Sequence, residues 1–145
     1  MSVDFFDANI FIYLFDETDA RKRGITEKML AQALMDVSGV ISFQVVQETL
    51  NVITTKLKVP ASSDDARRFL EKVLTPLWRI MPSPELYSSA IAIQSRFRYS
   101  FYDALIVAAA LEAGCSRLLT EDMQHGQRIE GLTIENPFLD SASDF

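Results

Sequence analysis

Residues 2–15, Ser-Val-Asp-Phe-Phe-Asp-Ala-Asn-Ile-Phe-Ile-Tyr-Leu-Phe, open with a loosely alternating apolar pattern that predicts a β-strand over residues 2–6. Asp7 follows this strand directly, Asn9 comes two residues later, and an apolar run fills residues 10–15. An acid is unusual among so many apolar neighbours. The segment therefore predicts a carboxylate at the carboxyl end of a buried strand.

The rest of the chain alternates short β-like runs with helical patterns. Further strands are predicted at residues 39–42, 77–81, 116–119 and 132–134. Helices are predicted to begin near Thr18 or Asp19 and near Ser42, Ser62, Ser83 and Ser100, all of which are residue types that cap helices. Pro60, Pro76 and Gly114 are predicted to end three of these helices. Strands separated by helices predict an α/β fold, with a mainly parallel β-sheet sandwiched between α-helices.

Length and composition predict one folded domain over residues 1–145, with a loose polar tail at residues 140–145. The sequence is 48% hydrophobic and 23% charged, which excludes a wholly disordered chain. Its longest apolar run, residues 104–111, is far shorter than the ~20 residues of a membrane-spanning helix. Because no signal peptide is recognisable at the start, we expect a soluble, cytoplasmic protein with no membrane contact.

The counts of cysteine and histidine restrict the chemistry further. One Cys excludes an internal disulfide, and one Cys with one His cannot supply a structural zinc site. Any metal chemistry must therefore rest on carboxylates. The net charge of −6 argues against a broad basic surface for nucleic acid, although local basic patches or bridging cations could still serve one.

Four acids lie in otherwise apolar segments, near the predicted carboxyl ends of strands or in the first turns of the helices that follow. They are Asp7, Glu48, Asp103 and Asp122. Each also has a purely structural interpretation. Asp7 could begin a turn or cap the following helix, and Asp122 could begin a turn. Glu48 could lie on a solvated helix face, and Asp103 could complete a capping box with Ser100.

Taken together, the four acids point to a cation site. Clustered carboxylates repel one another unless protons or cations compensate their charge. Oxygen ligands suit Mg²⁺ or Mn²⁺, and such ions catalyse phosphoryl displacement without His or Cys. The set therefore predicts a metal-dependent phosphoryl-transfer site.

Four ordered motifs resemble the PIN-domain family, and within it the VapC-like ribonuclease toxins of bacterial toxin–antitoxin pairs. They are Asp-Ala-Asn-Ile-Phe-Ile-Tyr at residues 7–13, Gln-Val-Val-Gln-Glu at 44–48, Phe-Tyr-Asp-Ala-Leu-Ile at 101–106, and Leu-Thr-Glu-Asp at 119–122. The resemblance implies that Asp7, Glu48, Asp103 and Asp122 hold Mg²⁺ or Mn²⁺ and are catalytic. It also implies that Asn9 and Thr120 shape the site, and it leaves open whether Glu121 assists or replaces Asp122.

The function implied is that of a Mg²⁺- or Mn²⁺-dependent endoribonuclease, which hydrolyses RNA phosphodiester bonds and works as a homodimer held inactive by a small protein antitoxin. Two other functions remain open at this stage. One is a non-catalytic PIN-like module that binds RNA or a protein. The other is a Mg²⁺-dependent phosphohydrolase that acts on DNA or on a small phosphate ester. The sequence does not indicate which residues would contact RNA.

Overall fold

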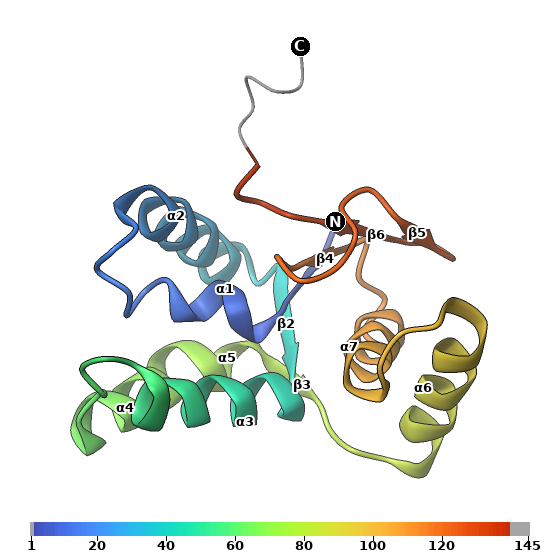
Figure 1. The fold of residues 1–145 in the computed structure, drawn as a ribbon, viewed down its shortest axis with the longest axis horizontal. Coiled ribbons are helices and arrows are strands. Elements are labelled where there is room, and N and C mark those ends of the chain that lie inside the picture. Colours follow the sequence, from blue (N-terminus) through green and yellow to red (C-terminus); the bar gives the residue numbers. More distant parts are fainter. Residues whose placement is uncertain (1, 140–145) are drawn as a thin grey trace.

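The computed structural model describes residues 2–139, and these form a sheet with helices on both sides (Figure 1). The strands are β1 (Asp4–Phe6), β2 (Gly39–Ser42), β3 (Trp78–Ile80), β4 (Arg117–Leu119), β5 (Arg128–Ile129) and β6 (Leu132–Glu135). Their order across the sheet is β3-β2-β1-β4-β6-β5, and every pairing is parallel except that of β5 with β6. The predicted α/β fold with a mainly parallel sheet is confirmed.

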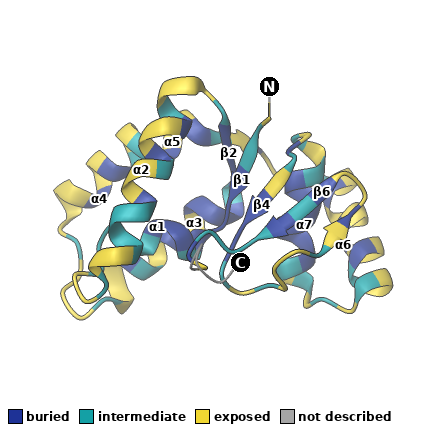
Figure 2. Cartoon of the chain, turned by 90° about the horizontal axis from the view of Figure 1, so that it is seen from above, coloured by how far each residue is buried: buried dark blue, intermediate teal, exposed yellow. Residues whose placement is uncertain are grey.

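Helices connect the parallel strands and form the two outer layers. They are α1 (Ala8–Ile12), α2 (Ala20–Asp36), α3 (Phe43–Asn51), α4 (Ser63–Phe69), α5 (Thr75–Leu77), α6 (Pro84–Phe97) and α7 (Phe101–Glu112). Two π-helical turns, Val52–Lys56 and Leu70–Leu74, extend α3 and join α4 to α5. Figure 2 shows α6 and α7 on one side of the strands and α2, α4 and α5 on the other.

The core lies where these helices cover the central strands. Phe5, Phe6 and Leu118 are almost completely buried, and so is every residue from 104 to 110 in α7. The longest apolar run of the sequence is therefore an interior helix. Within residues 2–139, no helix is both long enough and apolar enough to cross a bilayer.

The structure corrects two sequence predictions about helix ends. Ser42 stands at the N-cap position of α3, but its hydroxyl makes no capping hydrogen bond because the side chain is turned into the interior. Pro76 does not stop a helix; it lies in the first turn of α5, which continues from the π-helical turn Leu70–Leu74. The residues before Pro76 are already helical, so the proline lies inside a helical stretch that runs on from this π-helical turn.

One strand was not predicted, and one predicted segment lies outside the described residues. The two-residue strand β5 was not predicted, because it is too short to leave an alternating pattern. The predicted loose tail at residues 140–145 lies outside the described residues.

Candidate metal-binding nuclease site

Asp7 begins α1 at the carboxyl end of β1. Its Oδ1 accepts a hydrogen bond from the backbone N–H of Ala8 at 2.7 Å, so Asp7 does cap the short helix. Its Oδ2 accepts a hydrogen bond from the Thr120 hydroxyl, which follows β4, at 2.8 Å. Parallel pairing of β1 with β4 brings these two strand ends together. Capping accounts for only one oxygen of Asp7, and the other faces the site.

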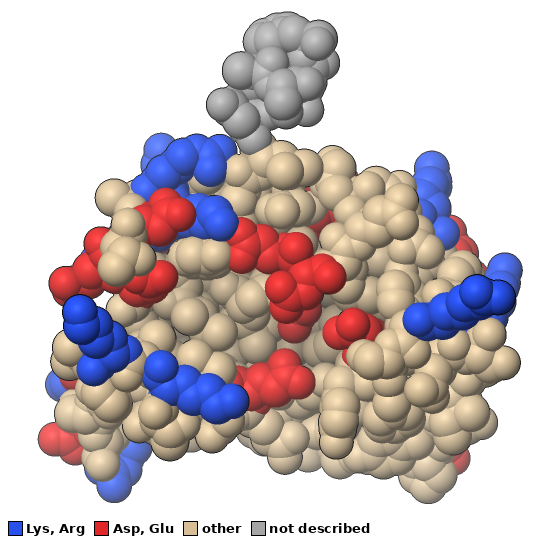
Figure 3. Space-filling view, viewed as in Figure 1, with Lys and Arg blue, Asp and Glu red and all other residues tan. Residues whose placement is uncertain are grey.

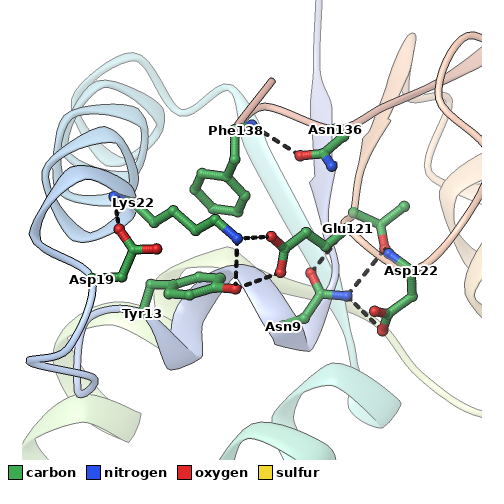
Figure 4. Close-up of polar contacts among 9 residues, drawn as sticks. Asn9, Tyr13, Asp19, Lys22, Glu121, Asp122, Asn136 and Phe138 are labelled. Atoms are coloured by element: carbon green, nitrogen blue, oxygen red, sulfur yellow. Dashed lines mark hydrogen bonds and ion pairs between the residues drawn. The ribbon is translucent and has the colours of Figure 1, made fainter. Parts of the chain in front are cut away.

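Asn9 connects Asp7 to Asp122. The Asn9 Nδ2 lies 2.9 Å from Asp122 Oδ2, 3.2 Å from Thr120 Oγ1 and 3.5 Å from Asp7 Oδ2. The Asn9 Oδ1 accepts the backbone N–H of Glu121 at 3.3 Å, which fixes the orientation of the amide (Figure 4). A hydrogen-bond donor thus stands between two carboxylates that would otherwise repel each other.

Asp7 has a raised pKa, chiefly because its side chain is buried. Asp7 is only 8% exposed, and burial raises its pKa from 3.8 to about 6. Hydrogen bonds from Thr120 and Ala8 oppose that shift, whereas the charges of Glu48 and Asp122 add to it. Glu48, on α3, is therefore close enough to act electrostatically on Asp7.

Glu48 lies on α3 and Asp103 in the first turn of α7, and Gln44 links these two helices. Gln44 donates hydrogen bonds from Nε2 to Glu48 Oε1 at 2.9 Å and to the backbone carbonyl oxygen of Tyr102 at 3.1 Å. Asp103 follows Tyr102 in the first turn of α7, where its backbone N–H is capped by the Ser100 hydroxyl at 3.2 Å. Within residues 2–139, the Asp103 carboxylate has no hydrogen-bond or ion-pair partner, so the predicted capping box is only half formed.

The Glu121 carboxylate binds Tyr13 and Lys22. Its Oε1 accepts the Tyr13 hydroxyl at 2.5 Å, and its Oε2 forms an ion pair with Lys22 of α2. The Lys22 Nζ also donates to the Tyr13 hydroxyl at 3.2 Å and lies 5.4 Å from the centre of the Phe138 ring. Both oxygens of Glu121 are thus occupied on the side away from Asp122 (Figure 4).

In the described part of the chain, the other four acids of the predicted site have no basic side chain paired with them. None of the ion pairs among residues 2–139 includes Asp7, Glu48, Asp103 or Asp122. Figure 3 shows acidic side chains gathered near the middle of one face, with basic side chains toward its margins. Within the same residues, no three His, Cys, Asp or Glu side chains converge closely enough to form a finished metal-binding group. Among the described residues, Asn9 joins Asp7 to Asp122 and the charge of Glu48 acts on Asp7, but the four acids do not form a closed set of ligands.

The donor set nevertheless fits a hard divalent cation. Every candidate ligand is a carboxylate oxygen, which Mg²⁺ and Mn²⁺ prefer. Burial is the main cause of the raised pKa of Asp7, and the charges of Glu48 and Asp122 add to it. A bound cation would compensate those charges.

Sequence reasoning missed the contribution of three residues. Lys22 lies in the basic run Arg21-Lys22-Arg23, which is typical of solvated surface. Tyr13 and Gln44 are in the motifs but had no predicted role. For Gln44 a signal existed, because residues four apart on a helix, such as Gln44 and Glu48, share a face. No comparable signal pairs Lys22 or Tyr13 with Glu121, which lies about a hundred positions away in the sequence.

The fold is that of a known family of domains. The sequence profile of the PIN domain matches residues 5–128, and the chain belongs to this family. Among curated proteins, none matches the sequence significantly.

Solved structures with the same fold include toxins of toxin–antitoxin systems. The VapC20 toxin of Mycobacterium tuberculosis, which cleaves the sarcin–ricin loop, is 21% identical, with 82% of this chain and 89% of that one aligned and a TM-score of 0.59. A toxin–antitoxin complex from Klebsiella pneumoniae is 20% identical, with 92% and 97% aligned and a TM-score of 0.63. VapBC2 of Rickettsia felis, bound to a DNA fragment from its promoter, is 18% identical, with 92% and 98% aligned and a TM-score of 0.66. At these identities the similarity establishes the fold.

Proposed function

We propose that this chain is a Mg²⁺- or Mn²⁺-dependent endoribonuclease that hydrolyses RNA phosphodiester bonds, and that it is the toxin of a toxin–antitoxin pair. The observation that carries the proposal is the Asp7–Asn9–Asp122 contact at the carboxyl ends of β1 and β4, with the charge of Glu48 acting on Asp7. Membership of the PIN-domain family and the fold shared with VapC toxins support the same function.

In this proposal Asp7, Glu48, Asp103 and Asp122 hold the cation. When bound, a divalent cation lowers the pKa of water and stabilises the charge that builds on phosphate oxygens. Asn9 and Thr120 keep the Asp7 and Asp122 carboxylates in place through the hydrogen bonds described above. One carboxylate of the set orients the attacking water or accepts its proton. Glu121 is left out of the proposed ligand set, because Lys22 and Tyr13 each bind one of its oxygens.

The decisive experiment compares substrates with and without metal. Purified protein is incubated with structured RNA, single-stranded DNA or a small phosphate ester, each in Mn²⁺ and in chelator. We expect cleavage of RNA alone, and only in Mn²⁺. An Asp7→Asn variant purified in the same way serves as the control for contaminating nuclease, and it should be inactive although folded.

Each other result selects a different function. RNA cleavage in chelator that disappears in Asp7→Asn would refute metal dependence. Activity restricted to DNA or to the ester would favour the phosphohydrolase. No activity on any substrate in Mn²⁺ would favour a non-catalytic binding module.

We further propose that the chain forms a homodimer and is inhibited by a small protein antitoxin. The support is that similar folds occur in toxin–antitoxin complexes, and that Ile91 of α6 and Tyr102 of α7 expose 58% and 66% of their surface. Sedimentation of the purified protein at several concentrations measures the first point. Co-purification with the product of a neighbouring short reading frame, followed by loss of RNA cleavage, tests the second.

A further inference from the structure

Gln44 links the two helices that carry Glu48 and Asp103. It lies in the first turn of α3, four residues before Glu48, and only 5% of its surface is exposed. Its Nε2 donates both to Glu48 Oε1, at 2.9 Å, and to the backbone carbonyl of Tyr102, at 3.1 Å. Tyr102 immediately precedes Asp103 in α7. A single amide group therefore joins the carboxylate of one helix to the beginning of the other.

The orientation of this amide is set by its two partners. A side-chain amide has two N–H donors and one acceptor oxygen, and both Glu48 and the Tyr102 carbonyl are acceptors. The nitrogen must therefore face them, which leaves Gln44 Oε1 buried with no hydrogen-bond partner among residues 2–139. A buried unpaired oxygen destabilises a folded protein. An apolar side chain of the same length would suit the core better if packing were the only requirement.

The contact with Glu48 has the properties of a ligand-orienting bond. The amide is neutral, so it fixes the Glu48 carboxylate without compensating its charge. It also uses only Oε1 and leaves Oε2 without a bond from Gln44. Carboxylates that bind metals are commonly held by such hydrogen bonds from neighbouring residues.

We propose that Gln44 is a positioning residue of the cation site, which holds Glu48 and the first turn of α7 together so that Glu48 and Asp103 can bind the same ion. This inference rests on the proposed function, because it requires that these acids bind a divalent cation. It assigns Gln44 no contact with the substrate.

The test uses Gln44→Met, which preserves the length of the side chain and removes the amide. Thr49→Val is the matched control, because Thr49 is also fully buried on α3 with an unpaired hydroxyl, but it forms no hydrogen bond to Glu48. Thermal melts of the full chain are recorded in chelator and across a series of Mn²⁺ concentrations. A cation that binds only the folded state raises the melting temperature according to its affinity.

We expect Gln44→Met to melt in chelator at or above the parent temperature, but to need at least about tenfold more Mn²⁺ for half of the parent's rise. Thr49→Val should keep the parent's Mn²⁺ dependence. Gln44→Asn keeps the amide on a side chain one methylene shorter, so it cannot span both acceptors. It should therefore also need more Mn²⁺, which gives a second measurement if Gln44→Met folds poorly.

Two failures are distinguishable. If the parent responds to Mn²⁺ and both Gln44 variants respond at the same concentrations, Gln44 is a packing residue and the inference is wrong. If the parent itself shows no rise in melting temperature with Mn²⁺, the proposed metal site is wrong, whatever the role of Gln44.

Discussion

The two carboxylate oxygens of Asp7 have different partners. Its Oδ1 caps α1 through Ala8, and its Oδ2 meets Thr120 and Asn9. Because the side chain is buried beside other acids, its charged form is disfavoured and its pKa rises to about 6. A residue needed only for capping would gain nothing from being buried with two other carboxylates nearby.

The raised pKa of Asp7 predicts how stability depends on pH without metal. The carboxyl group has a pKa of about 6 when folded and 3.8 when unfolded, so the folded state holds the proton more tightly. Stability should therefore fall as pH rises from about 4 to about 6, at a cost on the order of 2–3 kcal/mol. Asp7→Asn lacks this titration, so in chelator its stability relative to the parent should increase by that amount between pH 4 and pH 7. Urea unfolding at several pH values measures the difference, and a difference that does not change with pH would contradict the prediction.

Helix beginnings in this protein are mostly held by side-chain caps, as the sequence predicted. Asp19, Ser62, Ser83 and Ser100 each accept a hydrogen bond from a backbone N–H in the first turn of the following helix. At α7 the cap comes from Ser100 alone. The Asp103 carboxylate, which could have returned the bond in a capping box, is left available for the site.

The helix α7 therefore allows capping and metal binding to be separated by two variants. Ser100→Ala should destabilise the protein by about 1 kcal/mol, both in chelator and in Mn²⁺, because it removes the cap. Asp103→Ala should cost little or nothing in chelator, but should lose much of the rise in melting temperature that Mn²⁺ gives the parent. Thermal melts of both variants in chelator and in Mn²⁺ provide the measurement. If Asp103→Ala instead behaves like Ser100→Ala in both conditions, Asp103 belongs to the cap and not to the site.

Across the whole molecule, the site is assembled from segments that are far apart in the sequence. Lys22 of α2, Tyr13 after α1 and Glu121 after β4 form a cluster that ties the amino-terminal helices to the segment carrying Asp122. Hydrogen bonds to Glu121 and Tyr13 raise the pKa of Lys22 to about 12, so its ammonium group stays charged. The cluster therefore holds Glu121, the residue next to Asp122, against α2 and the end of α1.

The cluster predicts that Glu121 and its neighbour Asp122 respond differently to substitution. Glu121→Gln should lower stability by about 1 kcal/mol, the scale of a partly exposed ion pair, and Lys22→Met should lower it similarly. The rise in melting temperature with Mn²⁺ should remain in both variants. Asp122→Asn, the matched control, should reduce that rise. Loss of the Mn²⁺ response in Glu121→Gln would return Glu121 to the ligand set.

Local patterns in the sequence were enough to predict the layered fold. The strands at residues 39–42 and 116–119 and the helix start at Ser83-Pro84-Glu85 are set by short-range preferences that a single segment carries. The rule that strands joined through helices pair in parallel then placed Asp7 and Asp122 at one edge of the sheet. The motifs similarly identified the PIN-domain family, because its residues recur in a fixed order.

Contacts between distant segments could be decided only by the tertiary structure. The sequence left the role of Glu121 open, and the structure pairs it with Lys22 and Tyr13. It also predicted a cap at Ser42 and a helix end at Pro76, and both predictions were wrong because burial and the preceding π-helical turn overrode the local preferences. The physical reason is the same in each case. Side-chain direction, burial and charge compensation depend on which segments pack together, and that is a property of the folded chain as a whole.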